Sequence, residues 1–316
     1  MPTTDILLAT YDGARFLPEL IKSLDEQTDQ SWRVLVRDDG STDDTVDILH
    51  AWQSRLGDRF KMVKDSKGNL GAAGNFGALL EASDAEYFLP CDQDDFWLPT
   101  KIETLLAAIR AEEDKHSSDT PIIVHTDLIV VDEDMIVLAD SFWQYQRLRM
   151  QGKVPSWKLI TLQNNVTGCA MIGNRALLEQ ALPIPSSAIM HDWWLALYAS
   201  LHGQVVEIRE PSAKYRQHAS NTLGAQKWST LGAILLVAAR PRYALKEPRR
   251  VIEATRVQAR EMLARQQSVM SEQQKLFLSE YAGLADLGIL RRKTFPARHR
   301  LFYHGLARNV ALFLAV

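Results

Sequence analysis

The sequence predicts an α/β fold, in which a mostly parallel central sheet is flanked by helices and followed by a C-terminal helical appendage. Strand-like and helix-like segments alternate about every 15 to 25 residues as far as residue 227, and this alternation implies crossover connections between parallel strands. From about residue 228 the strand signals stop, and the chain becomes helical and rich in arginine. We therefore expect two parts, residues 1–227 with the sheet and residues 228–316 with helices alone.

The spacing of apolar side chains predicts each element of the first part. Residues 5–10 form the apolar run of a buried strand, and residues 13–28 repeat apolar side chains at helical spacing. Residues 33–45 form a strand that runs into a turn, where threonine and aspartate can cap a helix at 46–56. The later expected elements are a strand at 61–65, a helix at 72–83, a strand at 86–92, a helix at 99–114, a long strand or strand pair at 121–134, and a strand at 169–174.

The composition is that of a soluble globular protein. Of the 316 residues, 46% are hydrophobic and 24% are charged, which is ordinary for this class. Both cysteines, Cys91 and Cys169, lie in apolar stretches, so we expect no disulfide framework and a reducing compartment. The N-terminus lacks a basic region, and the longest apolar runs, 231–239 and 310–316, are shorter than the roughly 18 residues of a spanning helix. We therefore expect neither a secretory signal nor a membrane span.

Charge is distributed unevenly along the chain, although the net charge is only −3. Residues 240–316 contain 15 lysines and arginines against 6 aspartates and glutamates, a balance of +9, which leaves residues 1–239 with −12. A basic region beside an acidic one indicates two roles, and the basic region indicates an anionic surface as its neighbour. We expect no nucleic-acid partner.

Three acidic clusters are expected at the ends of strands. They are Asp38-Asp39, the group Asp92, Asp94 and Asp95, and His191-Asp192. Carboxylates this close repel one another, and a divalent cation relieves the repulsion. In an extended turn, Asp-x-Asp can present both carboxylates on one side, where oxygen ligands suit Mg²⁺ or Mn²⁺ with phosphate oxygens completing the shell. The alternatives are a solvated loop that caps the next helix for Asp92–Asp95, and a simple turn for Asp38-Asp39.

Seven segments in order resemble glycosyltransferases of family 2 with the GT-A fold. They are ATYDGARFLPELIKSLDEQT, VLVRDDGSTDDT, NLGAAGNFGALL, YFLPCDQDDFWLPTKIE, NVTGCAMIGN, MHDWWLALYAS and YRQHASNTLGA, and they span about residues 4–225. The segments DQDDFWLPTK, MHDWWLAL and YRQHASNTLGA resemble most the bacterial rhamnosyltransferases that build cell-wall rhamnan and O-antigen. The chain departs at Asp12, where many relatives have asparagine. It lacks the Gln-x-x-Arg-Trp motif of processive synthases, so the resemblance implies addition of one or a few sugars per encounter.

The resemblance implies that residues 1–115 form a nucleotide-binding half and residues 116–227 an acceptor half of one catalytic domain. The residues that it places at the nucleotide sugar are Thr10, Tyr11, Asp38, Asp39, Asn69, Gly71, Asp92, Gln93, Thr167, Gly168 and Arg216. Thr10 and Tyr11 would line the nucleotide pocket, and Asp39, with Asp38 beside it, would contact the base. Gly168 would let the backbone approach the donor sugar, with a simple turn as the alternative.

The resemblance also implies a metal site. Asp94 would contact Mg²⁺ or Mn²⁺, and Asp92 would contact the donor ribose or complete the metal shell. His218 would add a metal or diphosphate ligand, and its imidazole suits Mn²⁺ better than Mg²⁺; the alternative is an ordinary loop histidine. Arg216 would pair with the diphosphate. Asp95 would cap the following helix or support the metal ligands.

Asp192 matches the catalytic base of the family, which implies an inverting mechanism. It would remove a proton from the acceptor hydroxyl, which then attacks the anomeric carbon in line. His191 would orient Asp192 or contact the acceptor, unless it is a packed polar residue. Of the adjacent tryptophans, helical spacing places one in the core, and we expect Trp193 near the acceptor.

The expected reaction moves L-rhamnose from dTDP-L-rhamnose to a lipid-linked or polysaccharide acceptor of a bacterial cell surface. Other donors, such as a UDP-sugar, remain open. A nucleotidyltransferase is a second hypothesis, but it usually has a glycine-rich basic loop after the first strand, and TYDGARFL is not such a loop. A third hypothesis is a non-catalytic sugar-binding module.

The basic C-terminal region predicts attachment to an anionic membrane surface. Its basic residues are Arg240, Arg242, Arg249, Arg250, Arg291, Arg292, Lys293, Arg298 and Arg300, flanked by the apolar runs at 231–239 and 310–316. The expected location is the cytoplasm, at the inner face of the plasma membrane, where a lipid-linked acceptor would be reached. The alternatives are a solvated helical face packed on the catalytic domain, or a homodimer contact.

Overall fold

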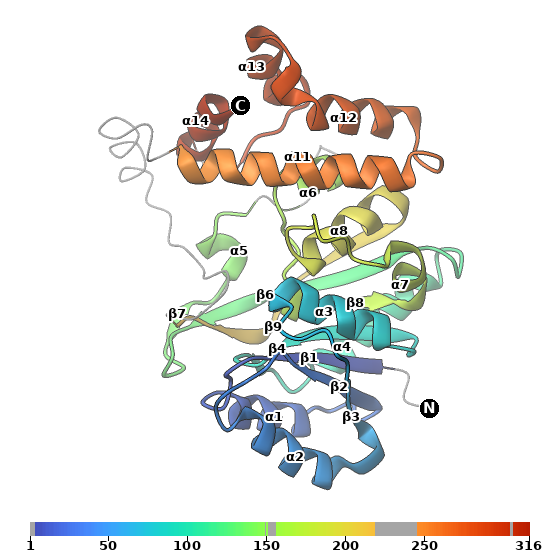
Figure 1. Ribbon diagram of the computed structural model, residues 1–316, viewed down its shortest axis with the longest axis vertical. Helices are drawn as coiled ribbons and strands as arrows, with labels where there is room; N and C mark the ends of the chain where they lie inside the picture. Colours follow the sequence, from blue (N-terminus) through green and yellow to red (C-terminus); the bar gives the residue numbers. More distant parts are fainter. Residues whose placement is uncertain (1–3, 149, 151–155, 219–244, 304–305) are drawn as a thin grey trace. The chain divides into compact units, whose positions relative to one another are not determined.

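A computed structural model describes residues 4–148, 150, 156–218, 245–303 and 306–316 (Figure 1). The predicted motif residues 219–225, the apolar run 231–239, Arg240 and Arg242 lie outside the described residues. The chain divides into two compact units. Unit 1 consists of 1–142, 166–184 and 190–224, and unit 2 of 143–165, 185–189 and 225–316. Unit 2 therefore takes two internal segments of the chain in addition to the C-terminal region.

The sheet of unit 1 has nine strands in the order β3-β2-β1-β4-β8-β6-β9-β5, and β7 pairs with β6. The strands are β1 (Thr4–Thr10), β2 (Trp32–Asp38), β3 (Phe60–Met62), β4 (Tyr87–Asp92), β5 (Phe96–Trp97), β6 (Ile122–Val131), β7 (Val137–Ala139), β8 (Met171–Asn174) and β9 (Gln204–Arg216). The pairs β1–β2, β1–β4, β2–β3 and β6–β9 are parallel, whereas β5, β7 and β8 run antiparallel to their partners. The parallel strands β2, β1 and β4 therefore end at one edge.

Helices cover both faces of this sheet. In unit 1 they are α1 (Leu17–Asp25), α2 (Thr45–Leu56), α3 (Gly71–Ala82), α4 (Lys101–Glu113), α7 (Arg175–Ala181) and α8 (His191–His202), with the short turns η1 (Gly57–Arg59) and η2 (Gly168–Ala170); α5 (Phe142–Tyr145) spans the boundary of the units. Figure 1 shows α1 and α2 on one side of β1 and β2, and α3 on the other side. The predicted fold, a central sheet flanked by helices, is confirmed.

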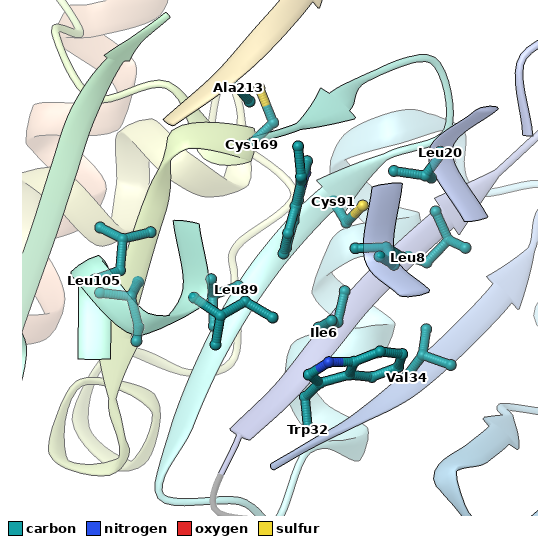
Figure 2. Packing of buried hydrophobic residues seen from close by; sticks show 14 of the residues in the cluster. Ile6, Leu8, Leu20, Trp32, Val34, Leu89, Cys91, Leu105, Cys169 and Ala213 are labelled. Carbon is teal, nitrogen blue, oxygen red and sulfur yellow. The ribbon is translucent and has the colours of Figure 1, made fainter. Parts of the chain in front are cut away.

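One hydrophobic cluster joins the sheet to α1, α2 and α4. Alternate residues of β1, Ile6 and Leu8, point into this cluster with Val34 of β2 and Leu89 of β4, and Leu20 of α1 packs on them (Figure 2). All are buried. Because side chains alternate along a strand, the residues between them face the opposite helical layer. Burial on both faces explains the unbroken apolar runs of these strands.

Unit 2 is helical in its described residues. Its elements are α6 (Ser156–Leu162), α11 (Lys246–Gln266), α12 (Glu272–Ala282), η3 (Leu284–Asp286), α13 (Ile289–Arg298) and α14 (Leu306–Ala315). Phe277 of α12 is central, since Trp157 packs edge-on against it at 5.1 Å between centroids and Phe295 lies at 5.6 Å. A capping box of Ser271 and Gln274 begins α12. Among the described residues, no helix is long and apolar enough to cross a bilayer.

Two predicted strands differ in their bounds. The strand expected at 61–65 is only Phe60–Met62, because the chain leaves the sheet there and Asp65 pairs with Arg37 instead. The segment 121–134 forms one long strand, β6, and Asp132 and Met135 turn it back toward β7. The lengths of these two strands were hard to predict, because their ends are set by contacts with other segments and not by the pattern of apolar residues within the strand.

Candidate active site

The carboxyl ends of β2, β1 and β4 bring two of the predicted acidic clusters together. Thr10 at the end of β1 pairs in register with Asp38 of β2, and its neighbour Ala9 pairs with Asp92 of β4. The hydroxyl of buried Thr10 donates to Asp38 Oδ1 at 2.9 Å. The strand ends therefore place Asp38 and Asp92 on either side of β1, at the edge where such sheets bind ligands.

The carboxylates of Asp38 and Asp39 hold loops of the protein. Asp38 accepts the backbone N–H of Ser41 at 2.8 Å and its hydroxyl at 2.5 Å, which closes the turn. Asp39 is buried and accepts the backbone N–H groups of Leu70 and Gly71, both at 2.8 Å, at the start of α3. Contact of either aspartate with a base stays a prediction, and their observed role is to fix the loops around the end of β1.

Arg37 completes this arrangement, and sequence reasoning missed it. Its guanidinium donates to Asp39 Oδ1 at 2.5 Å, to Asp65 Oδ2 at 2.8 Å and to the Gly68 carbonyl at 2.8 Å. Hydrogen bonds from Arg37 and from the Lys67 backbone lower the pKa of Asp65 to about 2. The signal in the sequence was the presence of arginines, Arg33 and Arg37, in a strand whose other residues from Trp32 to Val36 are apolar, because a buried arginine requires an acidic partner.

The loops after β1 and β4 are joined by Gln93. Its Oε1 accepts the Tyr11 backbone N–H at 2.9 Å, and its Nε2 donates to the Tyr11 carbonyl at 2.8 Å. A Cβ at Gly13 would lie 2.1 Å from Gln93 Oε1, so a larger residue there would displace the Gln93 amide from Tyr11. Asp12 has φ 46°, a left-handed conformation that aspartate, like the asparagine of many relatives, tolerates. The Tyr11 side chain is exposed and free to meet a nucleotide, whereas donor contact by Gln93 stays a prediction.

Asp92, Asp94 and Asp95 follow one another at the end of β4 but differ in environment. Asp92 and Asp94 are partly exposed, and Asp95 is 1% exposed. Burial, followed by the charges of Asp94 and Asp192, raises the pKa of Asp92 to about 7. The influence of Asp192 on Asp92 shows that the third acidic cluster lies close to the second.

His218 and Arg216 reach the Asp94 segment from β9. His218 Nε2 lies 2.7 Å from Asp94 Oδ2, and its ring packs on Phe16 at 4.6 Å between centroids. Buried Arg216 donates to the Asp94 carbonyl at 3.1 Å and pairs with Glu19. The structure thus brings His218 to the predicted metal residue. The pairing of Arg216 with a diphosphate stays a prediction, since its described contacts are with the protein.

Asp192 lies in the first turn of α8 rather than at the end of a strand, which corrects our expectation for the third cluster. Its Oδ2 accepts the Gly168 N–H at 2.9 Å, and it is partly exposed. The N-terminus of a helix favours a carboxylate because its backbone N–H groups carry partial positive charge. The close approach made by Gly168 is to α8, where an added Cβ would lie 2.8 Å from His191 Nε2.

The three residues around Asp192 divide between core and surface. His191 is buried and stacks on Phe76 at 4.0 Å between centroids, and burial lowers its pKa to about 3. This packing matches the polar-core alternative, and acceptor contact by His191 stays a prediction. Trp194 is buried and donates to the Ala181 carbonyl at 2.9 Å, so one tryptophan is in the core as expected. Trp193 is partly exposed, and its acceptor contact stays a prediction.

Comparison with known proteins decides the family. The sequence profile described as Glycosyl transferase family 2 matches residues 5–177, which is more than half of the chain. The chain belongs to glycosyl transferase family 2. This match confirms the resemblance predicted from the sequence motifs. Glycosyl transfer is the activity of this family.

Relatives in family 2 include proteins of several bacteria. The chain is 25% identical over 236 residues to the dTDP-rhamnosyl transferase RfbG of Shigella flexneri, covering 72% of this chain and 78% of that protein. It is 25% identical over 223 residues to an uncharacterized glycosyltransferase of Nostoc sp., covering 68% of this chain and 65% of the Nostoc protein. The match thus spans just under two thirds of the Nostoc protein.

Solved family structures share the fold. TarS 1–349 of S. aureus in complex with UDP-GlcNAc matches with a TM-score of 0.54 and 17% identity over 99% of this chain and 89% of that chain. Mannosyltransferase PcManGT from Pyrobaculum calidifontis, in complex with GDP-Man and Mn²⁺, matches with a TM-score of 0.52 and 17% identity over 100% and 86%. A longer TarS chain is covered to 43%. At these identities the likeness shows the GT-A fold alone.

The end of β4 in this family 2 chain fits a divalent cation. Asp92 and Asp94 are partly exposed carboxylates, the pKa of Asp92 is raised by burial and then by the charge of Asp94, and the imidazole of His218 lies beside Asp94. Within the described residues, Asp92, Asp95 and Cys169 also place ligand atoms within 4.8 Å of one another. Oxygen and nitrogen ligands in this arrangement suit Mg²⁺ or Mn²⁺.

Asp95 and Lys101 are two buried ionisable residues that both lie at Cys169, and sequence reasoning did not identify them as such. Asp95 is not the helix cap we considered, because no side chain caps α4. Lys101 is 1% exposed, and its Nζ donates to the Cys169 carbonyl and lies 3.5 Å from the Trp97 ring centroid. The signal was a lysine at the first position of a helix, where positive charge is unfavourable.

Proposed function

We propose that this chain is an inverting, metal-dependent glycosyltransferase that moves L-rhamnose from dTDP-L-rhamnose to a lipid-linked or polysaccharide acceptor in bacterial cell-surface glycan synthesis. The single observation that carries the proposal is the proximity of Asp192 to the metal-type carboxylates of Asp92 and Asp94. Ligand atoms of Asp92 and Cys169 lie within 4.8 Å of each other, and Gly168, the neighbour of Cys169, donates its N–H to Asp192 Oδ2 at 2.9 Å. In agreement with this proximity, the pKa of Asp92 is raised by burial and then by the charges of Asp94 and Asp192. A sugar-binding module has no need of a third carboxylate at this point.

The residues of the chain divide the work of transfer. Tyr11 presents its exposed ring beside the end of β1, where it can contact the nucleotide. Asp92, Asp94 and His218 would hold a divalent cation, which when bound supplies positive charge for the diphosphate leaving group. Asp192, whose Oδ2 the Gly168 N–H holds, would accept the proton of the acceptor hydroxyl.

The donor is proposed from the relatives. RfbG, a dTDP-rhamnosyl transferase by name, matches 72% of this chain, and the motifs DQDDFWLPTK and MHDWWLAL favour the same donor. The solved neighbours bind other donors, UDP-GlcNAc in TarS and GDP-Man in PcManGT. A UDP-sugar is therefore the second candidate.

A thermal-shift panel of nucleotide sugars, each with Mn²⁺, with Mg²⁺ and with a chelator, tests the donor and the metal together. A ligand at 100 times its Kd stabilises the folded protein by about 2.7 kcal/mol, so dTDP-L-rhamnose with metal should give the largest shift. A larger shift with a UDP-sugar would overturn the rhamnose assignment. Equal shifts with metal and with chelator would overturn the metal requirement.

Asp192→Asn tests the chemistry. The amide keeps the shape but cannot accept the proton, so transfer should fall by at least 100-fold, while the donor-induced thermal shift stays within 1 °C of that of the unmodified protein by our estimate. Glu179→Gln on α7 is a matched control, because Glu179 is an exposed carboxylate paired only with Arg175. Transfer by Asp192→Asn at the unmodified rate would remove Asp192 as the base.

We also propose that unit 2 contacts an anionic membrane through a patch formed by Ile289 and Leu290 of α13 and Phe313 and Leu314 of α14. Ile289 and Leu290 are 68% and 79% exposed. Lys293, one turn after Ile289, donates to the Phe313 carbonyl at 2.7 Å, which places the two helices side by side. Four exposed apolar side chains next to lysine match the pattern of an interfacial contact.

Positive charge surrounds the apolar patch. Burial and the charges of Arg292 and Arg249 lower the pKa of Lys293, so these cations lie together without full neutralisation. Arg291 is exposed beside them. Each basic residue near an anionic leaflet contributes roughly 1 kcal/mol to the free energy of membrane binding. The basic residues around the patch therefore favour an anionic lipid surface over an uncharged partner.

A further inference from the structure

Lys101 is buried where a cation is least expected. It is the first residue of α4, and its side chain is 1% exposed. The free N–H groups of a helix N-terminus repel positive charge, and removing an ammonium from water is costly. Both effects disfavour lysine at this position, so its surroundings must compensate for them.

Carboxylates, a carbonyl and an aromatic ring compensate Lys101. Its Nζ donates a hydrogen bond to the Cys169 carbonyl oxygen and lies 3.5 Å from the centroid of the Trp97 ring, whose face attracts cations. The charges of Asp95 and Asp92 favour the ammonium further and oppose the effect of burial on its pKa. The ammonium is therefore a cation built into the core behind the end of β4.

Asp95 is a buried carboxyl group near the same residue, Cys169, and burial raises its pKa well above the usual range. Asp95 is 1% exposed, and no N–H or O–H group of the described residues donates to either of its carboxylate oxygens. The thiol of Cys169 lies against it, within the 4.8 Å group that also includes Asp92. A buried carboxylate with so few donors requires a nearby cation. Lys101, whose Nζ is bonded to the carbonyl of the same Cys169, is the nearby cation whose charge acts on this group.

The same ammonium holds the turn that carries a contact of Asp192. Cys169 is the central residue of η2 (Gly168–Ala170), and Gly168 in that turn donates its N–H to Asp192 Oδ2 at 2.9 Å. Contacts thus run from Lys101 through the η2 turn to Asp192, and Asp95 lies near the Cys169 thiol of the same turn. All of these residues belong to unit 1.

We propose that Lys101 is a positioning residue for transfer: its ammonium fixes Asp95 behind the metal ligands and fixes the η2 turn that orients Asp192. The proposal rests on the proposed function, because it takes Asp192 as the base. In this proposal the positive charge that balances the group of Asp92, Asp95 and Cys169 comes from Lys101 and not from a metal ion. A divalent cation then belongs at the more exposed oxygens of Asp92 and Asp94.

Hydrogen exchange of the backbone amides tests the structural part without any donor. In Lys101→Met, amides in a peptide covering 166–171 should exchange at least tenfold faster, while a peptide covering β1, Thr4–Thr10, should keep its rate. Ile102→Val is the matched control, since Ile102 is the next buried residue of α4 and its change removes packing but no charge; it should leave both peptides unchanged. A folded Lys101→Met whose turn exchanges at the unmodified rate would overturn the proposal. Because no donor is present, this result is independent of whether the chain transfers rhamnose.

A double variant covers the case in which Lys101→Met does not fold. Asp95→Asn removes the charge left behind, so Lys101→Met with Asp95→Asn should melt at a higher temperature than Lys101→Met alone, or fold where it does not. The turn should still exchange at least tenfold faster in the double variant, because its donor is lost. A double variant that melts no higher than the single variant would refute the counter-ion role.

Kinetics distinguish positioning from simple support. With the donor that gives the largest thermal shift, the folded Lys101 variant should show kcat reduced at least tenfold and KM for the donor within twofold. A change in KM alone, or an unchanged kcat, would contradict the role of Lys101 in orienting Asp192. Absence of transfer by the unmodified protein would refute the proposed function and leave the exchange result standing.

Discussion

Substituting Gly168 with alanine tests how closely η2 must approach α8. The new Cβ would lie 2.8 Å from His191 Nε2, 3.3 Å from its Cε1 and 3.4 Å from Asp192 Cβ. Nonbonded heavy atoms prefer roughly 3.5–4.0 Å, so the turn and the helix must separate by about 0.7 Å. The His191 ring cannot rotate away freely, because it is stacked on Phe76 at 4.0 Å.

The cost follows from that separation. Overpacking of this size costs roughly 1–3 kcal/mol of stability. A misplacement of 1 Å in an active site can cost about 100-fold in rate, so we expect kcat to fall at least tenfold, with the Gly168–Asp192 hydrogen bond lengthened. Nucleoside diphosphate release from the nucleotide sugar measures the rate, and a thermal melt measures the stability.

Gly77→Ala is the matched control within the same unit. Its Cβ would lie 3.8 Å from Ile184 Cβ, an ordinary contact, and Gly77 is inside α3. This variant should be unchanged in rate and more stable by roughly 0.5–1 kcal/mol, because alanine is the better helix former. If Gly168→Ala instead transfers at the unmodified rate, the η2 turn does not set the position of Asp192 and the reasoning is wrong.

Other predictions concern pH, the membrane and the loop contact. Burial lowers the pKa of His191 in the folded protein to about 3, whereas its pKa in the unfolded chain is about 6.5. Between pH 7 and pH 5 only the unfolded chain therefore takes up a proton at this residue, and the folded protein loses roughly 2 kcal/mol of stability as the pH falls. His191→Phe should lack this loss in denaturant titrations at the two pH values, and an equal loss in both proteins would contradict a buried neutral ring. The double variant Ile289→Ser, Leu290→Ser should reduce co-sedimentation with anionic vesicles at least tenfold. Leu276→Ser, at a position on α12 that is 70% exposed, is the control and should leave co-sedimentation unchanged. If the double variant binds vesicles normally but loses a dimer in ultracentrifugation, the dimer alternative is favoured. Gln93→Leu should weaken donor binding at least fivefold in titration calorimetry with a fall in melting temperature of only about 1–3 °C, since two exposed hydrogen bonds are lost; unchanged donor affinity would argue against a role for this loop.

The fold was predictable because periodicity determines it. The apolar run at 5–10 predicted a buried strand, and the alternation of strands and helices predicted crossover units and a largely parallel sheet; the position of β4 beside β1 came from the structure. The sequence also predicted that Asp38 and Asp92 follow strands, and in a parallel sheet such residues can lie at one edge. The antiparallel insertion of β8 between β4 and β6 was not predictable, because no local signal distinguishes its direction from that of a parallel strand.

The candidate site was predictable in its residues but less so in their contacts. Asp94 and His218 were expected to share a ligand, and the structure brings them to 2.7 Å. Sequence patterns could not show that Asp39 and Gln93 are engaged by protein backbone, because such contacts depend on where the loops at Tyr11 and Gly71 fold back. The choice of Trp193 as the less buried of the two tryptophans agrees with the structure, in which Trp194 is the core residue.

The engagement of Asp39 at the start of α3 has a wider consequence. In dinucleotide-binding folds the amino end of a crossover helix cradles the pyrophosphate of the cofactor. Here Asp39 already occupies the amides of Leu70 and Gly71, so at α3 the protein has neutralised its own dipole. Under the proposed function, the phosphates of a nucleotide-sugar donor would find no such cradle at α3, and a divalent cation would supply the positive charge instead. A requirement of the transfer reaction for a metal ion would then follow from the occupied N-terminus of α3.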